Sequence, residues 1–186
     1  MKYNPNKHHR HSIRLQGYDY SSEGAYFVTI CVKDRECLFG KIQNEQMILN
    51  EYGKIVEQCW LNLPNHYHNI VLDAYIIMPN HFHGIIFIVD SSDNNVRAIN
   101  VRAIHESPRQ QQRRKMLLPK IIGRFKMNSA KQINQIRNMP GVPVWQRNYY
   151  EHIIRNEESL NNIRNYIINT PSKWFNDEYS SKMNKK

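Results

Sequence analysis

The order of the predicted elements indicates an α+β fold, with an antiparallel-rich central sheet flanked by helices. Short segments rich in β-branched and aromatic residues alternate with longer segments whose apolar residues recur every three or four positions. Two of the short segments are joined by Pro79-Asn80, a dipeptide that favours a tight turn. The chain of 186 residues has the length of a single domain with a core of its own.

Five segments have the composition of strands, because β-branched and aromatic side chains suit a pleated sheet. They are residues 25–33, a short stretch within 39–48, 70–78, 82–89 and 145–152. The third and fourth lie on either side of Pro79-Asn80, which predicts a β-hairpin.

Three segments have helical periodicity. They are residues 48–63, 117–137 and about 156–168. The last begins at Asn156, a favourable N-cap, with Glu157 and Glu158 in the first turn, where they complement the helix dipole. Pro171 biases Thr170 away from helical backbone. Strands and helices together follow the order β-(β)-α-β-β-α-β-α.

The chain is expected to form one domain over residues 25–175, with a basic arm over 1–24 and a lysine-rich tail over 176–186. Residues 90–115 are polar and charged, and they contain Asn-Val-Arg-Ala-Ile twice in succession. Two such short copies are too few for a repeat fold. We therefore expect a variable loop inside the domain.

The sequence lacks several features that would indicate a membrane-bound or secreted protein. No apolar run approaches the roughly 20 residues that a membrane span needs, and the polar, basic N-terminus lacks the apolar core of a secretory signal. Cys31, Cys37 and Cys59 have no Cys-x-x-Cys spacing, so neither a disulfide framework nor a cysteine zinc site is expected. These features predict a cytoplasmic protein without a membrane partner.

The chain is strongly basic, with 26 Lys and Arg against 16 Asp and Glu and a formal net charge of +10. Such an excess is typical of proteins that bind a polyanion, because each neutralised phosphate releases counterions. The alternative is that the charge serves solubility alone. The candidate phosphate ligands, each of which also fits a solvated surface, are Lys120, Arg124, Lys126, Arg147 and Arg155.

His81 and His83 form a His-x-His pair at the start of a predicted strand. Residues i and i+2 of a strand project from the same face, so the two imidazoles can share one metal ion. The pattern alone is weak, but two unpartnered imidazoles would be costly on an otherwise apolar strand. Two ligands leave the coordination sphere open, which suits a Lewis acid acting at phosphate and argues against a closed structural zinc site.

Tyr166 lies on the last predicted helix, three residues after Ile163 and one before Ile167. Helical periodicity alone indicates a tyrosine at the edge of the core, with its hydroxyl in water.

Several blocks of the sequence occur in an order known from one family. They are residues 10–20 (Arg-His-Ser-Ile-Arg-Leu-Gln-Gly-Tyr-Asp-Tyr), the strand at 24–30, Met-Pro-Asn-His-Phe-His-Gly at 78–84, Trp-Gln-Arg at 145–147, residues 150–156, and Tyr-Ile-Ile-Asn-Thr-Pro at 166–171 with Trp174. Over nearly the whole chain they resemble the REP-associated tyrosine transposases. This family belongs to the HUH single-tyrosine transposases of small bacterial insertion sequences.

The resemblance implies a ferredoxin- or RRM-like palm with the histidine pair on a central strand. It implies that Tyr166 is the nucleophile and that His81 and His83 bind Mg²⁺ or Mn²⁺. The implied activity is that of a transposase and endonuclease. It cleaves and rejoins single-stranded or hairpin DNA through a 5′-phosphotyrosine, without a nucleotide cofactor. The family includes both dimers and monomers, so a homodimer stays open.

One position departs from the family pattern. Members usually carry Asn or Gln four residues after the tyrosine as a third metal ligand, whereas this chain has Thr170 there and Asn169 one position earlier. Either Thr170 supplies an oxygen, or Asn169 is re-aimed, or metal binding is weakened. The alternative function is therefore a nucleic-acid-binding module of the same fold with weakened or no catalysis. A hydrolase that uses water would need acidic residues near the histidines, and residues 75–89 contain none.

Overall fold

A computed structural model describes residues 23–89 and 117–176. Its centre is a four-stranded antiparallel sheet with the strand order β4-β5-β1-β6. The strands are β1 (Gly24–Cys31), β4 (Ile70–Met78), β5 (His81–Ile88) and β6 (Tyr150–Ile154). The predicted arm, inner loop and tail fall on or next to residues 1–22, 90–116 and 177–186, which lie outside the described residues.

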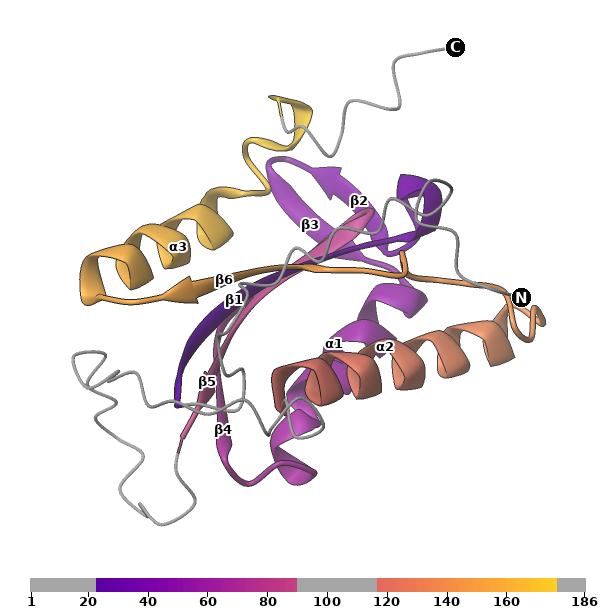
Figure 1. Ribbon diagram of the computed structural model, residues 1–186. Coiled ribbons are helices and arrows are strands. Elements are labelled where there is room, and N and C mark those ends of the chain that lie inside the picture. Colours follow the sequence, from indigo (N-terminus) through magenta and orange to yellow (C-terminus); the bar gives the residue numbers. More distant parts are fainter. Residues whose placement is uncertain (1–22, 90–116, 177–186) are drawn as a thin grey trace, which may run out of the picture.

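Helices cover both faces of this sheet (Figure 1). The helices α1 (Glu51–Leu61) and α2 (Leu117–Ile136) lie on one face, and α3 (Glu157–Asn169) lies on the other. A small second sheet pairs β2 (Gly40–Gln43) with β3 (Gln46–Leu49). The predicted α+β fold, an antiparallel sheet flanked by helices, is thus confirmed. Within the described part of the chain, no helix is both long and apolar enough to cross a membrane.

The strand that holds both histidines, β5, is joined to β4 by a hairpin, as the Pro79-Asn80 turn predicts. Met78 pairs with His81 across the hairpin, and on its other side β5 pairs with β1, so that Thr29 lies opposite His83. The turn is also fixed from outside, because the backbone N–H of Val32 donates to the carbonyl of Asn80 at 2.8 Å. His81 therefore starts β5 at a rigid point of the fold.

Alternation along the strands separates two cores. The larger core lies under α1 and α2 and contains Trp60, Phe82, Ile86 and Phe125. The smaller one lies under α3, and its sheet residues include Phe27, Ile85 and Phe87. A β-bulge between Leu72 and Tyr75 interrupts the pairing of β4 with β5. This bulge lies below α3, which contacts β4 more than any other strand.

The structure differs from the sequence prediction in three local details. The stretch 39–48 contains most of a hairpin rather than one strand, with Asn44 and Glu45 in the left-handed turn conformation at φ 50° and 59°. Trp145 forms only an isolated bridge with Val32, and β6 begins later. Thr170 stays in helical conformation before Pro171, since its N–H and its hydroxyl both donate to carbonyls of α3. Within residues 23–89 and 117–176, Cys31, Cys37 and Cys59 form no disulfide.

Candidate functional site

His81 and His83 lie side by side on the α3 face of β5. Their ring centroids are 4.6 Å apart, and the side chains are 0% and 1% exposed. Phe82 between them points to the other face, where it packs against Trp60 at a centroid distance of 4.5 Å. The two-residue period of the strand thus places both imidazoles in one small volume.

Each imidazole is oriented by a hydrogen bond at Nδ1. The side-chain oxygen of Asn80 lies 2.8 Å from Nδ1 of His81, and the Asn80 amide nitrogen donates to the carbonyl of Arg35 at 3.2 Å. Because that second bond fixes the amide orientation, Nδ1 of His81 carries the hydrogen and Nε2 carries the lone pair. Thr29 Oγ1 lies 2.8 Å from Nδ1 of His83 and orients that ring from the neighbouring strand. Such outer hydrogen bonds are typical of histidines that bind metal through Nε2.

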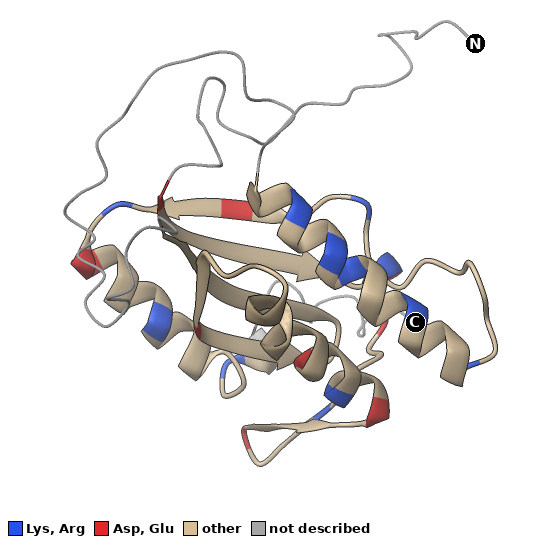
Figure 2. Cartoon of the chain, turned by 90° about the horizontal axis from the view of Figure 1, so that it is seen from below, with Lys and Arg blue, Asp and Glu red and all other residues tan. Residues whose placement is uncertain are grey.

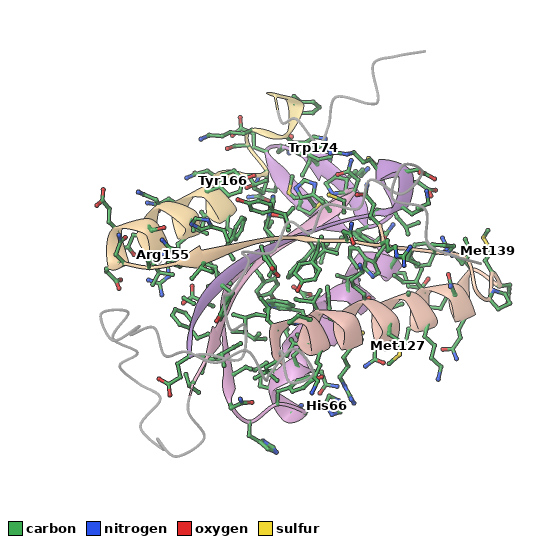
Figure 3. The ribbon with its side chains drawn as sticks, viewed as in Figure 1. His66, Met127, Met139, Arg155, Tyr166 and Trp174 are labelled. Atoms are coloured by element: carbon green, nitrogen blue, oxygen red, sulfur yellow. The ribbon has the colours of Figure 1, made fainter. Side chains whose placement is uncertain are left out.

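Tyr166 reaches the histidine pair from α3. Its hydroxyl lies 3.3 Å from Nε2 of His83, although the two residues are 83 positions apart in the chain. Phe27 supports both groups, since it stacks on His83 at 5.4 Å and meets the Tyr166 ring edge-on at 6.1 Å. The tyrosine is 42% exposed, so a ligand from solvent can approach it (Figure 3). The structure therefore brings the predicted nucleophile and the predicted metal ligands together.

Burial keeps both histidines neutral. Desolvation lowers the pKa of His81 to about 2, with smaller contributions from His83 and Arg35, and it lowers the pKa of His83 to about 3. A neutral imidazole offers the lone pair that a metal ion requires, so no proton has to be displaced at neutral pH.

The donor set fits a divalent cation that keeps open positions. Two neutral imidazoles with oriented rings would provide two nitrogen ligands. Across residues 23–89 and 117–176, His, Cys, Asp and Glu form no group of three or more that could hold a metal ion. Further ligands would then be oxygens of a substrate, of water or of an uncharged side chain, which is the arrangement suited to action at phosphate.

Thr170 and Asn169 both bond to the backbone of α3 in this structure. The hydroxyl of Thr170 donates to the carbonyl of Tyr166 at 2.7 Å, and this side chain is buried. The Asn169 amide nitrogen donates to the carbonyl of Asn165 at 2.7 Å, and that residue is exposed. Trp174 belongs to the C-terminal block that resembles the transposases, and it stacks on His81 at a centroid distance of 6.0 Å.

An ion pair that the sequence did not predict fixes α3 to the sheet. Arg164 donates two hydrogen bonds to the carboxylate of Asp73, at 2.9 and 2.6 Å. Asp73 lies in the β4 bulge, and the hydrogen bonds from Arg164 hold the pKa of its carboxyl below the usual value. The sequence contains a signal only in retrospect, because a lone Asp in an apolar strand is unusual.

The five predicted phosphate ligands lie in different places. Lys120, Arg124 and Lys126 belong to α2, on the sheet face opposite Tyr166, and Figure 2 shows Lys and Arg along this helix. The ammonium of Lys126 donates to the carbonyls of Gln146 and Arg147, and burial lowers its pKa, so it fastens the 145–149 segment to α2.

The three arginines among the candidate phosphate ligands differ in their contacts and in their exposure. A guanidinium nitrogen of Arg124 lies 3.2 Å from Nδ1 of His66. Arg147 is exposed before β6. Arg155 is exposed between β6 and α3, on the same side of the sheet as Tyr166 (Figure 3). Of the five, Arg155 is thus placed nearest in the fold to the tyrosine helix.

Comparison with known proteins yields one close relative in sequence and a more distant likeness in structure. No protein-family model matches the chain. An uncharacterised protein of Haemophilus influenzae is 44% identical over 178 residues, which cover 95% of this chain and 96% of that protein. A likeness of this extent shows common family membership.

Two solved structures resemble the fold. One is a REP-associated tyrosine transposase bound to a REP hairpin, with a TM-score of 0.51 and 15% identity over 88% of this chain and 74% of that one. The other is a candidate transposase of Deinococcus radiodurans, with a TM-score of 0.44 and 15% identity over 84% of this chain and 97% of that one, a likeness too weak to add weight. The chain therefore belongs to the same family as the Haemophilus influenzae protein, and its fold resembles that of a REP-associated tyrosine transposase.

Proposed function

We propose that this protein cleaves and rejoins single-stranded or hairpin DNA, with Tyr166 as the attacking group. The observation that carries the proposal is the 3.3 Å contact between the Tyr166 hydroxyl and Nε2 of His83. A partly exposed nucleophile beside an oriented pair of buried, neutral imidazoles is the arrangement that phosphoryl transfer to tyrosine needs.

The proposed reaction is a transesterification at phosphorus. The Tyr166 oxygen forms a bond to the scissile phosphorus while the bond from phosphorus to the 3′ oxygen breaks. The phenol loses its proton and the leaving oxygen gains one, so the products are a 5′-phosphotyrosine and a free 3′-OH. A 3′-OH of the same or another strand then attacks the linkage and restores the tyrosine, and no nucleotide cofactor is consumed.

Each residue of the site has a distinct role in this scheme. Bound Mg²⁺ or Mn²⁺ would polarise the scissile phosphate, with Nε2 of His81 and of His83 as its protein ligands. In the structure, the His83 nitrogen faces the Tyr166 hydroxyl instead. One lone pair cannot serve a hydrogen and a metal at once, so a bound ion and the Tyr166 hydroxyl would compete for Nε2 of His83. Phe27 meets the tyrosine ring edge-on and helps to hold it beside the histidines.

The substrate class follows from charge and from the structural neighbour. The net charge of +10 favours a nucleic acid, and the neighbour with the matching fold is bound to a REP hairpin. Of the five candidate cations, Arg155 lies nearest to α3, at the end of the helix away from Tyr166, where it can contact a backbone phosphate further along the strand. The nucleoid and the cytoplasm are the matching location for such an activity.

A second candidate is a DNA-binding module of this fold that does not cut. The observation in its favour is that Thr170 and Asn169 donate hydrogen bonds to carbonyls of α3. If neither becomes a third ligand, the metal is held by two histidines alone and binds weakly.

Formation of a covalent adduct decides between the two. The full-length protein would be incubated with Mn²⁺ and DNA hairpins that carry single-stranded flanks, followed by denaturing electrophoresis. The ³²P label is placed at the 3′ end or internally, because the DNA on the 3′ side of the cleaved bond is the part that stays on the tyrosine. We expect a labelled protein band with wild type and none with Tyr166→Phe. Tyr149→Phe is the matched control, because Tyr149 packs against the larger core on the other face, and it should keep the band. Adduct formation by Tyr166→Phe would disprove the assignment of the nucleophile. No adduct with wild type on any of these substrates would favour the binding module.

A further inference from the structure

An open groove of about 500 Å³ runs beside Tyr166 between the sheet and α3. Phe27, Tyr150 and His152 line it from β1 and β6, and Glu158, Asn162 and Tyr166 line it from α3. Its volume falls in the range of about 300–1,000 Å³ that is typical of ligand sites. Because Tyr166 is part of its wall, whatever the groove holds lies next to the group that attacks phosphorus.

The two long sides of α3 differ in how their polar groups are used. On the β4 side, Arg164 bonds Asp73 and also contacts Asn161 and Glu157. On the groove side, the side chains of His152, Glu158 and Asn162 make no hydrogen bond, ion pair or ring contact with any other described residue. Polar groups that converge on a hollow without partners of their own are available to a ligand.

The chemistry of the groove fits a base rather than a phosphate. The carboxylate of Glu158 repels an anion, and none of the described residues that line the groove is a Lys or Arg. Tyr150, which is 52% exposed, offers an aromatic face on which a base can stack. Carboxylate and amide oxygens accept hydrogen bonds from the amino groups of cytosine and adenine. Arg155, at the β6 end of α3, is available for the accompanying phosphate.

We infer that this groove binds an unpaired nucleobase with an exocyclic amino group, from a nucleotide next to the phosphate that Tyr166 attacks. Glu158 and Asn162 accept hydrogen bonds from the amino group, and Tyr150 stacks on the ring. The inference rests on the proposed function and adds a preference for cytosine or adenine over thymine beside the cleaved bond.

The test compares oligo-dC with oligo-dT of equal length, which have the same backbone charge and differ in the presence of the amino group. Fluorescence anisotropy of labelled oligonucleotides would measure their affinities for the full-length protein in EDTA, where no cleavage occurs. We expect wild type to bind oligo-dC about fivefold more tightly, the gain of one good hydrogen-bonding contact to a base edge. Glu158→Gln should reduce this preference to less than about twofold, because its amide also donates to thymine. Asn162→Ala should reduce it as well.

Glu157→Gln is the matched control, since it removes the same charge from the neighbouring position outside the groove. It should leave the preference for oligo-dC intact. Equal affinities of wild type for both oligonucleotides would overturn the inference, and so would a preference that survives Glu158→Gln or disappears equally in Glu157→Gln. The adduct assay is separate. A protein that forms the adduct without preferring oligo-dC would contradict only the base site. A protein that prefers oligo-dC without forming the adduct would contradict only the catalytic proposal.

Discussion

Phe82 and His83 are neighbours in β5 that face opposite sides of the sheet, and their surroundings differ in kind. Phe82 is fully buried among Trp60, Tyr75 and Phe125. On the same face, a Cβ added to Gly84 would lie 2.6 Å from the Trp60 ring, which shows how closely the helix α1 packs on the strand. His83, by contrast, contacts Thr29, Phe27 and Tyr166, and beyond the tyrosine lies an open groove.

Under the proposed function, one face of β5 serves stability and the other serves catalysis. The face under α1 and α2 is closed by two helices and an aromatic cluster, so its residues serve packing. The face under α3 is covered by a single helix, anchored by the Asp73–Arg164 pair and by a smaller apolar cluster. Regions of lower local packing are where proteins place groups that must bind and release a substrate.

Shortening one side chain to alanine on each face of β5 should give the largest difference between the two faces. Phe82→Ala should lower the free energy of unfolding by about 3–5 kcal/mol, because it opens a cavity in a closed core. His83→Ala should cost about 1–2 kcal/mol, since the thinner α3 side can relax, and yet it should abolish the covalent adduct. Urea denaturation and the adduct assay measure the two effects. Equal destabilisation by both substitutions would contradict the distinction between the faces.

Acid should lower the free energy of unfolding of the metal-free protein through its two buried histidines. The folded-state pKa values of His81 and His83 are about 2 and 3, whereas the ordinary value of 6.5 applies to the unfolded chain. The unfolded state therefore takes up protons first. The stability is fully present above about pH 6.5 and falls as the pH drops below it, by up to about 1.4 kcal/mol per pH unit for each histidine.

The comparison variant for this experiment is His83→Gln, which keeps a polar side chain and removes one titrating group. Urea unfolding between pH 7 and pH 5 should show a shallower dependence on pH than wild type. If the two slopes were the same, His83 would not be a buried neutral group, and the electrostatic contrast between the faces would be wrong.

Much of this contrast could be predicted from the sequence. The period of two along residues 81–89 separates His81 and His83 from Phe82, and the Pro79-Asn80 turn predicts the hairpin that fixes their position. The N-cap Asn156 and the helix that follows it were also predictable, because capping is local: its side chain accepts from the N–H of Ser159.

Long-range features could not be predicted from the residues alone. The approach of Tyr166 to His83 joins segments 83 residues apart, and helical periodicity indicates only a tyrosine at the core edge. The resemblance to a transposase family pointed to this pair, but the Asp73–Arg164 bonds depend on a bulge in β4 that has no local signature. Likewise, nothing in the sequence distinguished Lys126, whose ammonium is held by carbonyls, from a solvated lysine.

Loosening the anchor of α3 should have a moderate effect. Asp73→Asn removes the charge from a carboxylate that is 20% exposed and bonded twice by Arg164, so we expect a loss of about 1 kcal/mol. Because the anchor positions Tyr166, adduct formation should slow several-fold while the affinity for DNA stays unchanged. Glu157→Gln is the control, since Glu157 is 63% exposed and its contact with the same arginine is long, at 3.8 Å. A variant that weakens DNA binding but not the rate would show that the pair does not position the tyrosine.

The smallest effect is expected at Thr170, which stands where the REP-associated tyrosine transposases usually carry Asn or Gln. Thr170→Val keeps the shape of the side chain and removes only the hydroxyl, whose observed bond goes to the carbonyl of Tyr166. Such bonds within a helix contribute little, so the free energy of unfolding should change by less than about 1 kcal/mol. If the hydroxyl is not a ligand, calorimetric titration with Mn²⁺ should give the same affinity as wild type. A marked loss of affinity in Thr170→Val, without the same loss in Asn169→Ala, would instead make Thr170 the third ligand. A gain in Thr170→Asn would show that an amide at this position reaches the metal, and that the site of this chain is a weakened form of the family arrangement.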